Sequence, residues 1–278
     1  MRTAARRLLF AALCLWPVLA QADDYTRTRY PIVLAHGMSG FDRLFGLIEY
    51  FHEVPRALRD GGATVFVTEV SQFNDTTVRG EQLLAQVEEI VAITGAGKVN
   101  LIGHSHGGLD ARYVASVRPD LVASVTTIGT PHQGADLANW LRARVRNGSF
   151  TEEVMGFFAN QLGFILALLS GTDNPQDAVA ALDSLTRAGL EQFNRDHPQG
   201  LPARWCGEGP AQVEGVRYYS WTGTHPVTNL LDITDAAFAL TSLVYGEPTD
   251  GLAGKCSTHL GDVIRDDYRM NHLDEVNL

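Results

Sequence analysis

Residues 99–108 read V-N-L-I-G-H-S-H-G-G, and this stretch carries the strongest structural signal in the chain. Its apolar beginning, up to Ile102, predicts a buried strand, and residues 109–117 place apolar side chains at helical spacing. Ser105 therefore lies at the tip of a sharp turn between a strand and a helix. In that setting a G-x-S-x-G sequence presents a serine as a nucleophile.

The two glycines of the pentapeptide have a steric role. Gly103 and Gly107 lie two residues before and two residues after Ser105, where a Cβ would meet neighbouring backbone in a strained turn. A glycine-rich strand-to-helix turn without chemistry is the alternative, because the pentapeptide alone is a weak motif. The strand before it and the helix after it favour the catalytic interpretation.

The first 22 residues have the pattern of a secretory signal peptide. Three arginines precede an apolar run over residues 8–19, which ends at an A-x-A sequence over 20–22. The run is too short to span a membrane, and an N-terminal anchor is the alternative. We therefore expect a secreted protein whose mature part, residues 23–278, forms one domain with a full core.

Charge and cysteine content restrict the function further. Three of the 22 Lys and Arg residues fall in the signal peptide, which leaves 19 against 32 acidic residues and a net charge of −13. Such acidity argues against nucleic acid and against electrostatic docking on anionic membranes, so contact with lipid would be hydrophobic. Cys206 and Cys256 remain in the mature chain, and an even pair in an exported protein favours a disulfide.

Strands and helices alternate through the first half of the mature chain. Residues 30–35, 64–70 and 123–128 predict strands, and 78–93 predict a helix, so we expect a mainly parallel sheet. Residues 216–222 predict a later strand.

Two segments lack this alternation. Residues 41–58 are expected to be helical in part. Residues 135–200 contain no clear strand and include an unusually apolar stretch over 150–170, which is either a core helix or a mobile amphipathic cap over the active site. Its place after the serine turn favours the cap, so we expect a helical cap insertion over about 135–200.

A serine nucleophile needs a histidine base and an acid that orients it, and in this chain order the acid precedes the histidine. His272 lies in a polar turn before Asp274-Glu275, the expected start of a final helix, which suits a base. His259 is the competing residue, although its position near Cys256 favours a structural hydrogen bond. His132 and His197 are expected at the surface or in the cap, and His225 has few later residues to supply its acid.

Asp250 is the leading candidate for the acid. It lies in a P-T-D-G turn after an apolar helix, where its carboxylate could accept the imidazole N–H. The competing aspartates are Asp232, Asp235, Asp262, Asp266 and Asp267, of which the last three fit a solvated charged face. At the other end of the chain, the strand over 30–35 leads into His36-Gly37, where a glycine turn could aim the Met38 N–H at the reaction centre.

The sequence closely resembles the secreted Pseudomonas-type bacterial triacylglycerol lipases, which are α/β-hydrolases. Matching stretches are Y-P-I-V-L-A-H-G-M at 30–38, V-R-G-E-Q-L-L at 78–84, K-V-N-L-I-G-H-S-H-G-G at 98–108, R-Y-V-A-S-V-R-P-D-L at 112–121, C-G-E-G at 206–209, Y-Y-S-W at 218–221, D-G-L at 250–252 and Y-R-M-N-H-L-D-E-V-N at 268–277. They extend over nearly the whole mature chain.

By position, the resemblance implies that Ser105 is the nucleophile, Asp250 the orienting acid and His272 the general base. The backbone N–H groups of Met38 and His106 would form the oxyanion hole. The implied reaction is the hydrolysis of long-chain acylglycerol esters at a lipid–water interface.

The resemblance also implies several features outside the triad. Cys206 would pair with Cys256. Asp232 and Asp274 would bind a structural Ca²⁺, with the backbone carbonyl of Leu278 at the next ligand position. The protein would be a monomer, folded by a dedicated membrane-anchored foldase and exported through the periplasm.

Two other functions stay open at the level of the sequence. One is a carboxylesterase or polyester hydrolase acting on short or polymeric esters. The other is a non-catalytic α/β-hydrolase module that binds a partner, although such a module has no reason to keep a complete triad.

Overall fold

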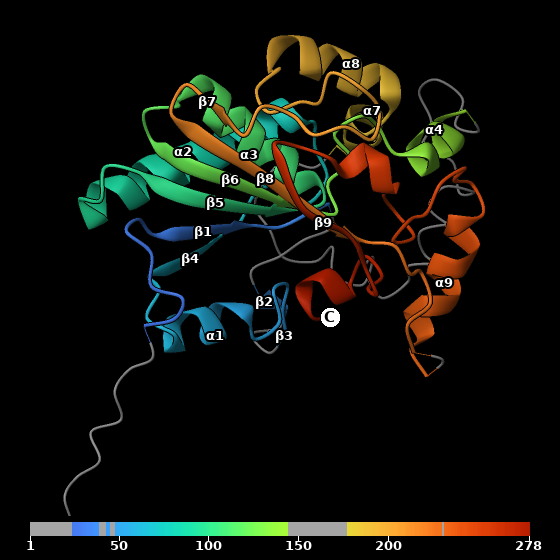
Figure 1. The fold of residues 1–278 in the computed structure, drawn as a ribbon, viewed down its shortest axis with the longest axis horizontal. Coiled ribbons are helices and arrows are strands. Elements are labelled where there is room, and N and C mark those ends of the chain that lie inside the picture. The colour runs from blue at the N-terminus through green and yellow to red at the C-terminus, as the bar shows by residue number, and fades with distance from the viewer. Residues whose placement is uncertain (1–23, 39–42, 45–47, 144–176, 230) are drawn as a thin grey trace, which may run out of the picture.

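The computed structural model describes residues 24–38, 43–44, 48–143, 177–229 and 231–278. At its centre is a sheet with the strand order β4-β1-β5-β6-β8-β7, to which β9 is added by pairing with β8. Figure 1 shows helices α2 and α3 on one side of this sheet and α1 on the other. The predicted signal peptide, residues 1–22, lies outside the described residues.

The strands of the main sheet are β1 (Ile32–Ala35), β4 (Val65–Thr68), β5 (Val99–His104), β6 (Val122–Ile128), β7 (Gln212–Val213), β8 (Val216–Gly223) and β9 (Asp262–Tyr268). All neighbouring strands in it run parallel except β7, which is antiparallel to β8. The prediction of a mainly parallel sheet is therefore confirmed. A separate antiparallel pair joins β2 (Arg43–Leu44) to β3 (Ile48–Glu49).

The described helices are α1 (Val54–Asp60), α2 (Thr76–Thr94), α3 (His106–Val117), α4 (Asp136–Arg142), α7 (Ala178–Ser184), α8 (Arg187–Asp196) and α9 (Ile233–Ser242), with 3₁₀ turns η1 (Lys255–Thr258) and η2 (Asp274–Val276). The helix predicted over 78–93 is confirmed as α2. Its first turn begins earlier because the Asp75 carboxylate accepts hydrogen bonds from the N–H groups of Thr77 and Val78. Gly95 ends it in the left-handed conformation.

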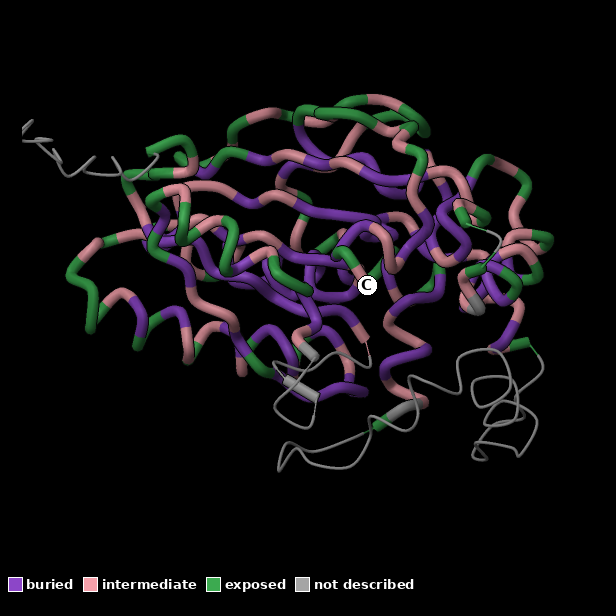
Figure 2. Tube along the Cα trace, turned by 90° about the horizontal axis from the view of Figure 1, so that it is seen from below, coloured by how far each residue is buried: buried purple, intermediate pink, exposed green. Residues whose placement is uncertain are grey.

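Strand β1 contributes to both faces of the core because its side chains alternate. Val33 and Ala35 pack with apolar residues of α2 and α3, whereas Ile32 and Leu34 belong to a second cluster with Phe51, Val65 and Val276. All four β1 residues are buried, as Figure 2 shows for the centre of the sheet. Burying an apolar side chain of this size contributes about 1.5–3 kcal/mol, so β1 is anchored from both sides.

One expectation needs correction. Asp274-Glu275 does not start a final helix, because η2 is a 3₁₀ turn that ends at Asn277 in the left-handed conformation. Residues 41–58 are helical in part, as expected: α1 begins at Val54, and the described residues before it include the short strands β2 and β3. The described parts of 135–200 form helices α4, α7 and α8, as expected, but the apolar stretch over 150–170 lies outside the described residues.

Candidate active site

Ser105 occupies the strained turn that the sequence predicts. Strand β5 ends at His104, α3 begins at His106, and Ser105 between them has φ 55° and ψ −128°. A Cβ on Gly103 would lie 2.3 Å from the Gly107 carbonyl oxygen, and a Cβ on Gly107 would lie 2.3 Å from the Ala35 carbonyl oxygen. Only glycine fits at either position, so the steric reason for the motif is confirmed.

The structure joins Asp250 to His272 by two hydrogen bonds. His272 Nδ1 lies 2.6 Å from Asp250 Oδ2, and the His272 N–H donates to the Asp250 carbonyl oxygen at 3.0 Å. The other carboxylate oxygen, Oδ1, accepts from the N–H groups of Leu252 and Ala253 at 2.8 and 2.7 Å. A carboxylate oxygen can only accept when ionised, so the ring carries its proton on Nδ1 and leaves Nε2 as a base.

Ser105 and His272 line the same small cavity, which has a volume of about 60 Å³. Met38 lies on its wall as well, and the rest of the lining is apolar: Pro131, Ala135, Leu137, Ala138, Leu141, Leu182, Leu185 and Leu252. Most of these side chains come from α4, α7 and the loops before them. The cavity therefore combines a serine hydroxyl and an imidazole with a surface suited to a hydrocarbon chain.

Two backbone N–H groups are available beside Ser105. His106 is the first residue of α3, so its N–H has no acceptor inside the helix. The Met38 N–H donates to no backbone acceptor among the described residues. A Cβ on Gly37 would lie 2.7 Å from Ser105 Cβ, which shows how closely the Met38 loop approaches the nucleophile.

A buried polar network lies behind His272, and sequence reasoning missed it. The Tyr50 hydroxyl lies 2.6 Å from His104 Nδ1, and His104 Nε2 lies 3.3 Å from Glu275 Oε2. The same Glu275 oxygen is 3.8 Å from His272 Nδ1. Glu275 Oε1 accepts from the Gly223 N–H at 2.6 Å.

Burial dominates the ionisation of this network. It raises the pKa of Glu275 well above the usual value, with the Asp250 charge acting in the same direction, and it lowers the pKa of His104. The three-residue spacing from His272 was the only sequence signal for Glu275, and its acidic neighbour Asp274 made it resemble an ordinary helix start.

The other candidate histidines lie elsewhere. His259 bonds to the Gly207 carbonyl at 3.0 Å and to Asp266 Oδ2 at 3.1 Å, which confirms a structural role. His197 is half-buried and bonds to Ser116 Oγ at 2.9 Å. The expectation that His132 lies at the surface or in the cap is wrong, because it is fully buried between Arg112 and Thr127.

The competing aspartates also have other partners. Asp262, Asp266 and Asp267 lie on β9. Asp262 and Asp267 are exposed, and Asp267 pairs with Arg265 at 2.6 Å, so the solvated charged face is confirmed for these two. Asp266 is half-buried and instead contacts His259 and Lys255. Asp235 is buried and accepts from Asn271 Nδ2 at 2.8 Å and from the N–H groups of Thr228 and Asn229.

Asp232 and Asp274, the residues implied to bind Ca²⁺, both border the loop before α9. Asp232 Oδ1 accepts from the Thr234 N–H at 2.8 Å, and Asp274 Oδ2 accepts from Thr228 Oγ1 at 2.8 Å and from the Asn271 N–H at 3.0 Å. The second oxygen of each carboxylate has no hydrogen bond within the described part of the chain. Asp232 and Asp274 therefore each have a carboxylate oxygen that could bind a cation, and Ca²⁺ prefers such hard oxygen ligands.

Cys206 and Cys256 form a disulfide across a sequence separation of 50 residues, as expected. The Glu247 carboxylate accepts from the Cys256 N–H at 3.0 Å and so fixes the turn that follows Asp250. The disulfide thereby ties the Asp250 loop to the segment before β7.

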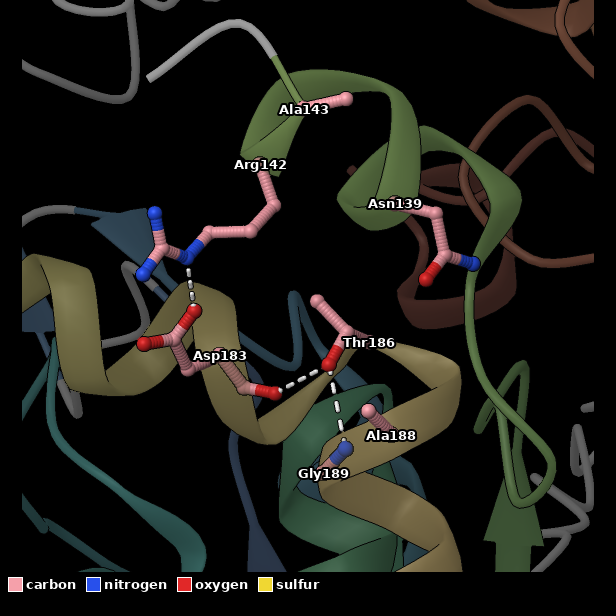
Figure 3. Close-up of a pocket in the computed structure, with 7 residues that line it drawn as sticks. All are labelled: Asn139, Arg142, Ala143, Asp183, Thr186, Ala188 and Gly189. Atoms are coloured by element: carbon pink, nitrogen blue, oxygen red, sulfur yellow. Dashed lines mark hydrogen bonds and ion pairs between the residues drawn. The ribbon is translucent and has the colours of Figure 1, made fainter. Parts of the chain in front are cut away.

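A larger cleft of about 550 Å³ lies between α4, α7 and α8 (Figure 3). Its charged side chains, Arg142 and Asp183, form an ion pair, and the Thr186 hydroxyl accepts from the Gly189 N–H at 3.1 Å to cap α8. Among its lining residues there is no nucleophile with a base beside it. Size therefore does not mark the reactive site, whereas the small cavity at Ser105 has the required groups.

A serine on a strained turn beside a histidine–aspartate pair, at the end of parallel strands, defines a serine hydrolase built on an α/β sheet. The alpha/beta hydrolase fold family matches residues 30–253, which is most of the chain, and the chain belongs to this family.

Within the family, the chain is similar to bacterial proteins named triacylglycerol lipase. The protein from Vibrio cholerae is 57% identical over 92% of this chain and 82% of its own length, and the one from Pseudomonas fragi is 45% identical over 92% and 90%. Among solved structures, the Bacillus licheniformis lipase BlEst2 in its mature form superposes with a TM-score of 0.63 at 20% identity, covering 89% of this chain and 86% of that one. This last similarity concerns the fold.

Proposed function

We propose that the protein is a triacylglycerol lipase, which hydrolyses long-chain acylglycerol esters at a lipid–water interface through Ser105, Asp250 and His272. The observation that carries the proposal is the 2.6 Å contact between His272 Nδ1 and Asp250 Oδ2 beside Ser105, in one apolar cavity. The names of the relatives at 57% and 45% identity support the substrate class.

In the proposed reaction, Ser105 Oγ attacks the ester carbonyl while His272 Nε2 takes its proton. Asp250 holds the ring in the required tautomer and stabilises the imidazolium. His272 then protonates the leaving alkoxide, and a diacylglycerol departs from the acyl-enzyme. Water, activated by the same histidine, releases the fatty acid and restores Ser105.

The N–H groups of Met38 and His106 would stabilise the oxyanion of both tetrahedral intermediates. Each is a fixed backbone donor beside an apolar wall, where a hydrogen bond to a developing charge is stronger than in water. Loss of one such donor costs about 3 kcal/mol of transition-state stabilisation.

Exposed leucines support contact with a lipid surface. Leu231, Leu240 and Leu243 lie on or next to α9 and are 90%, 47% and 77% exposed. Helix α9 adjoins the Asp250 loop, since a Cβ on Gly251 would lie 2.7 Å from Phe238 Cβ. An acidic protein gains no attraction to anionic lipid, so apolar contact of this kind would have to hold it there.

Export, assembly and Ca²⁺ binding belong to the same proposal. We expect a secreted monomer that needs a foldase during export. No helix of the described residues is long and apolar enough to cross a membrane. Asp232, Asp274 and the carbonyl of Leu278 would hold Ca²⁺, which would supply charge that stabilises the loop of His272 and would take no part in the chemistry.

A carboxylesterase for short esters is the second candidate, because the cavity at Ser105 is small, with a volume of about 60 Å³. The deciding experiment compares turnover of triolein emulsion and of tributyrin by the mature protein, with Ser105→Ala as the blank. Turnover of triolein that disappears in Ser105→Ala supports the lipase. Turnover of tributyrin alone supports the esterase, and no turnover by folded protein leaves the binding module.

The Ca²⁺ site is tested separately by unfolding. The melting temperature of the mature protein is measured with Ca²⁺ and with a chelator, beside Asp274→Asn. We expect Ca²⁺ to raise the melting temperature of the parent and to have little effect on the variant. Equal melting curves with and without Ca²⁺ in the parent contradict the site.

A further inference from the structure

The peptide between Gly37 and Met38 is held from its carbonyl side. Its oxygen, Gly37 O, lies 2.8 Å from His36 Nδ1 and 3.4 Å from Arg79 Nη2. No peptide bond of the described chain is cis, and in a trans peptide the C=O and N–H point in opposite directions. Whatever fixes the Gly37 carbonyl therefore also fixes the direction of the Met38 N–H.

The hydrogen bonds of His36 define which of its nitrogens carries the proton. The Val70 N–H donates to His36 Nε2 at 3.2 Å, so this nitrogen is an acceptor without a hydrogen. The neutral ring then carries its hydrogen on Nδ1 and donates it to Gly37 O. Burial, together with the charge of Arg79, lowers the pKa of His36 to about 3, so the ring is neutral at the pH of catalysis.

Two further side chains complete the surroundings of this loop. Arg79 donates to the His36 carbonyl oxygen at 2.9 Å, and its guanidinium is held by Asp110 Oδ2 at 2.7 Å. A Cβ on Gly37 would lie 2.6 Å from the Tyr50 hydroxyl oxygen, so Tyr50 packs against the same loop. Arg79 and Tyr50 are both buried, and the loop is therefore enclosed by polar side chains that hold it in place.

We propose that His36 is a positioning residue of the oxyanion hole: by donating Nδ1–H to the Gly37 carbonyl, it aims the Met38 N–H at the oxyanion before substrate binds. The inference rests on the proposed acyl transfer at Ser105. His36 is not among the residues that line the cavity at Ser105, and its effect passes through one peptide plane. Donors fixed in advance lower the barrier because no reorganisation accompanies the reaction.

Two substitutions separate this role from a merely structural one. In His36→Asn, the amide nitrogen can take the place of Nδ1 and keep the donor to Gly37 O. In His36→Gln, the amide reaches the place of Nε2, so the bond from the Val70 N–H can be kept while the donor to Gly37 O is lost. The pair therefore removes the two hydrogen bonds of His36 one at a time.

The assay is steady-state hydrolysis of soluble p-nitrophenyl butyrate, with inhibition by an alkyl boronic acid that mimics the tetrahedral intermediate. For His36→Gln we expect kcat to fall about 10²-fold with KM nearly unchanged, and boronate affinity to fall in parallel. His36→Asn should keep kcat within about fivefold of the parent, because it keeps the donor. An equal loss in both variants, or a larger loss in His36→Asn, would overturn the proposal.

A second measurement needs no substitution. In protein with ¹⁵N-labelled histidine, the nitrogen shifts of His36 should report a neutral ring protonated on Nδ1, and protonation on Nε2 would refute the proposal even if neither variant folds. Labelling of the parent at Ser105 by a fluorophosphonate separates the proposed hydrolase function from the proposed role of His36. A parent that does not label fails the proposed function, whereas a reactive parent matched by His36→Gln fails only the role of His36.

Discussion

Replacing Gly107 by alanine should damage both stability and activity, because the added methyl group would meet two backbone carbonyls just before Met38, a proposed oxyanion donor. The new Cβ would lie 2.3 Å from the Ala35 oxygen and 2.5 Å from the His36 oxygen. Ordinary contact begins at about 3.4 Å, so α3 and β1 would have to separate by about 1 Å. Neither partner is the flexible end of a side chain.

The expected cost follows from two opposing effects. Overpacking a rigid site costs up to about 3 kcal/mol, while alanine is favoured over glycine inside a helix by about 1 kcal/mol. We therefore expect Gly107→Ala to lower the free energy of unfolding by about 2 kcal/mol. The His36 carbonyl belongs to the loop that ends in Met38, so kcat should fall as well, by about 10²-fold, the effect of one misplaced oxyanion donor.

Urea unfolding measures the first quantity, and hydrolysis of soluble p-nitrophenyl butyrate measures the second. Gly246→Ala is the matched control, because its Cβ would meet nothing within 4 Å and its backbone has an ordinary φ. The control should unfold within about 0.5 kcal/mol of the parent and keep its kcat. If Gly107→Ala behaves like the control in both assays, the steric explanation of the G-x-S-x-G turn is refuted.

Three further predictions concern the proposed base His272, the buried His36 and the disulfide. His272→Asn should lower kcat by about 10⁴-fold or more on the same soluble ester while leaving the urea midpoint nearly unchanged, and a loss below tenfold would argue against its role as the base. Folding lowers the pKa of His36 from 6.5 to about 3. Between pH 6.5 and about pH 3, His36 is therefore protonated in the unfolded chain and neutral in the folded one. The free energy of unfolding falls as the pH falls through this range. Urea unfolding of the parent should lose about 1.4 kcal/mol per pH unit more than His36→Asn does there, and parallel slopes would contradict the burial of a neutral ring. Replacing Cys206 and Cys256 by serine should lower the free energy of unfolding by about 4 kcal/mol through the loop of 50 residues, with intact protein in reductant as the comparison, and a loss below 1 kcal/mol would show that this loop is already ordered in the unfolded chain.

The main elements of the fold were accessible from local patterns. The strands at 30–35, 64–70 and 123–128 have apolar or β-branched residues, and each is recovered as β1, β4 or β6 with ends shifted by one or two residues. The turn at Ser105 could be predicted for the same reason, because the glycine spacing, the strand before it and the helix after it are all properties of neighbouring residues. Asp250 and His272 could be ranked from their turn sequences and from chain order.

Contacts between residues far apart in the sequence could not be predicted in this way. His132 looked like a surface residue because nothing near it in the sequence shows that Arg112 and Thr127 enclose it. Glu275 follows Asp274 and was expected at the start of a helix, yet its carboxylate contacts His104 and the Gly223 N–H, residues more than 50 positions away. A one-dimensional pattern records periodicity and local spacing, and the partners of a buried polar group are set by neither.

The sequence by itself determined the α/β architecture, the serine turn, the chain order of the three proposed catalytic residues, and the pair of cysteines. Each depends on short-range sterics or on chain order, which the residues display directly. Only the tertiary structure decided which nitrogen of His36 bears the proton, what supports the Met38 N–H, and which carboxylates surround His272. These are properties of packing between β1, β4, β5 and the C-terminal turn, where desolvation makes each hydrogen bond obligatory and so fixes its direction.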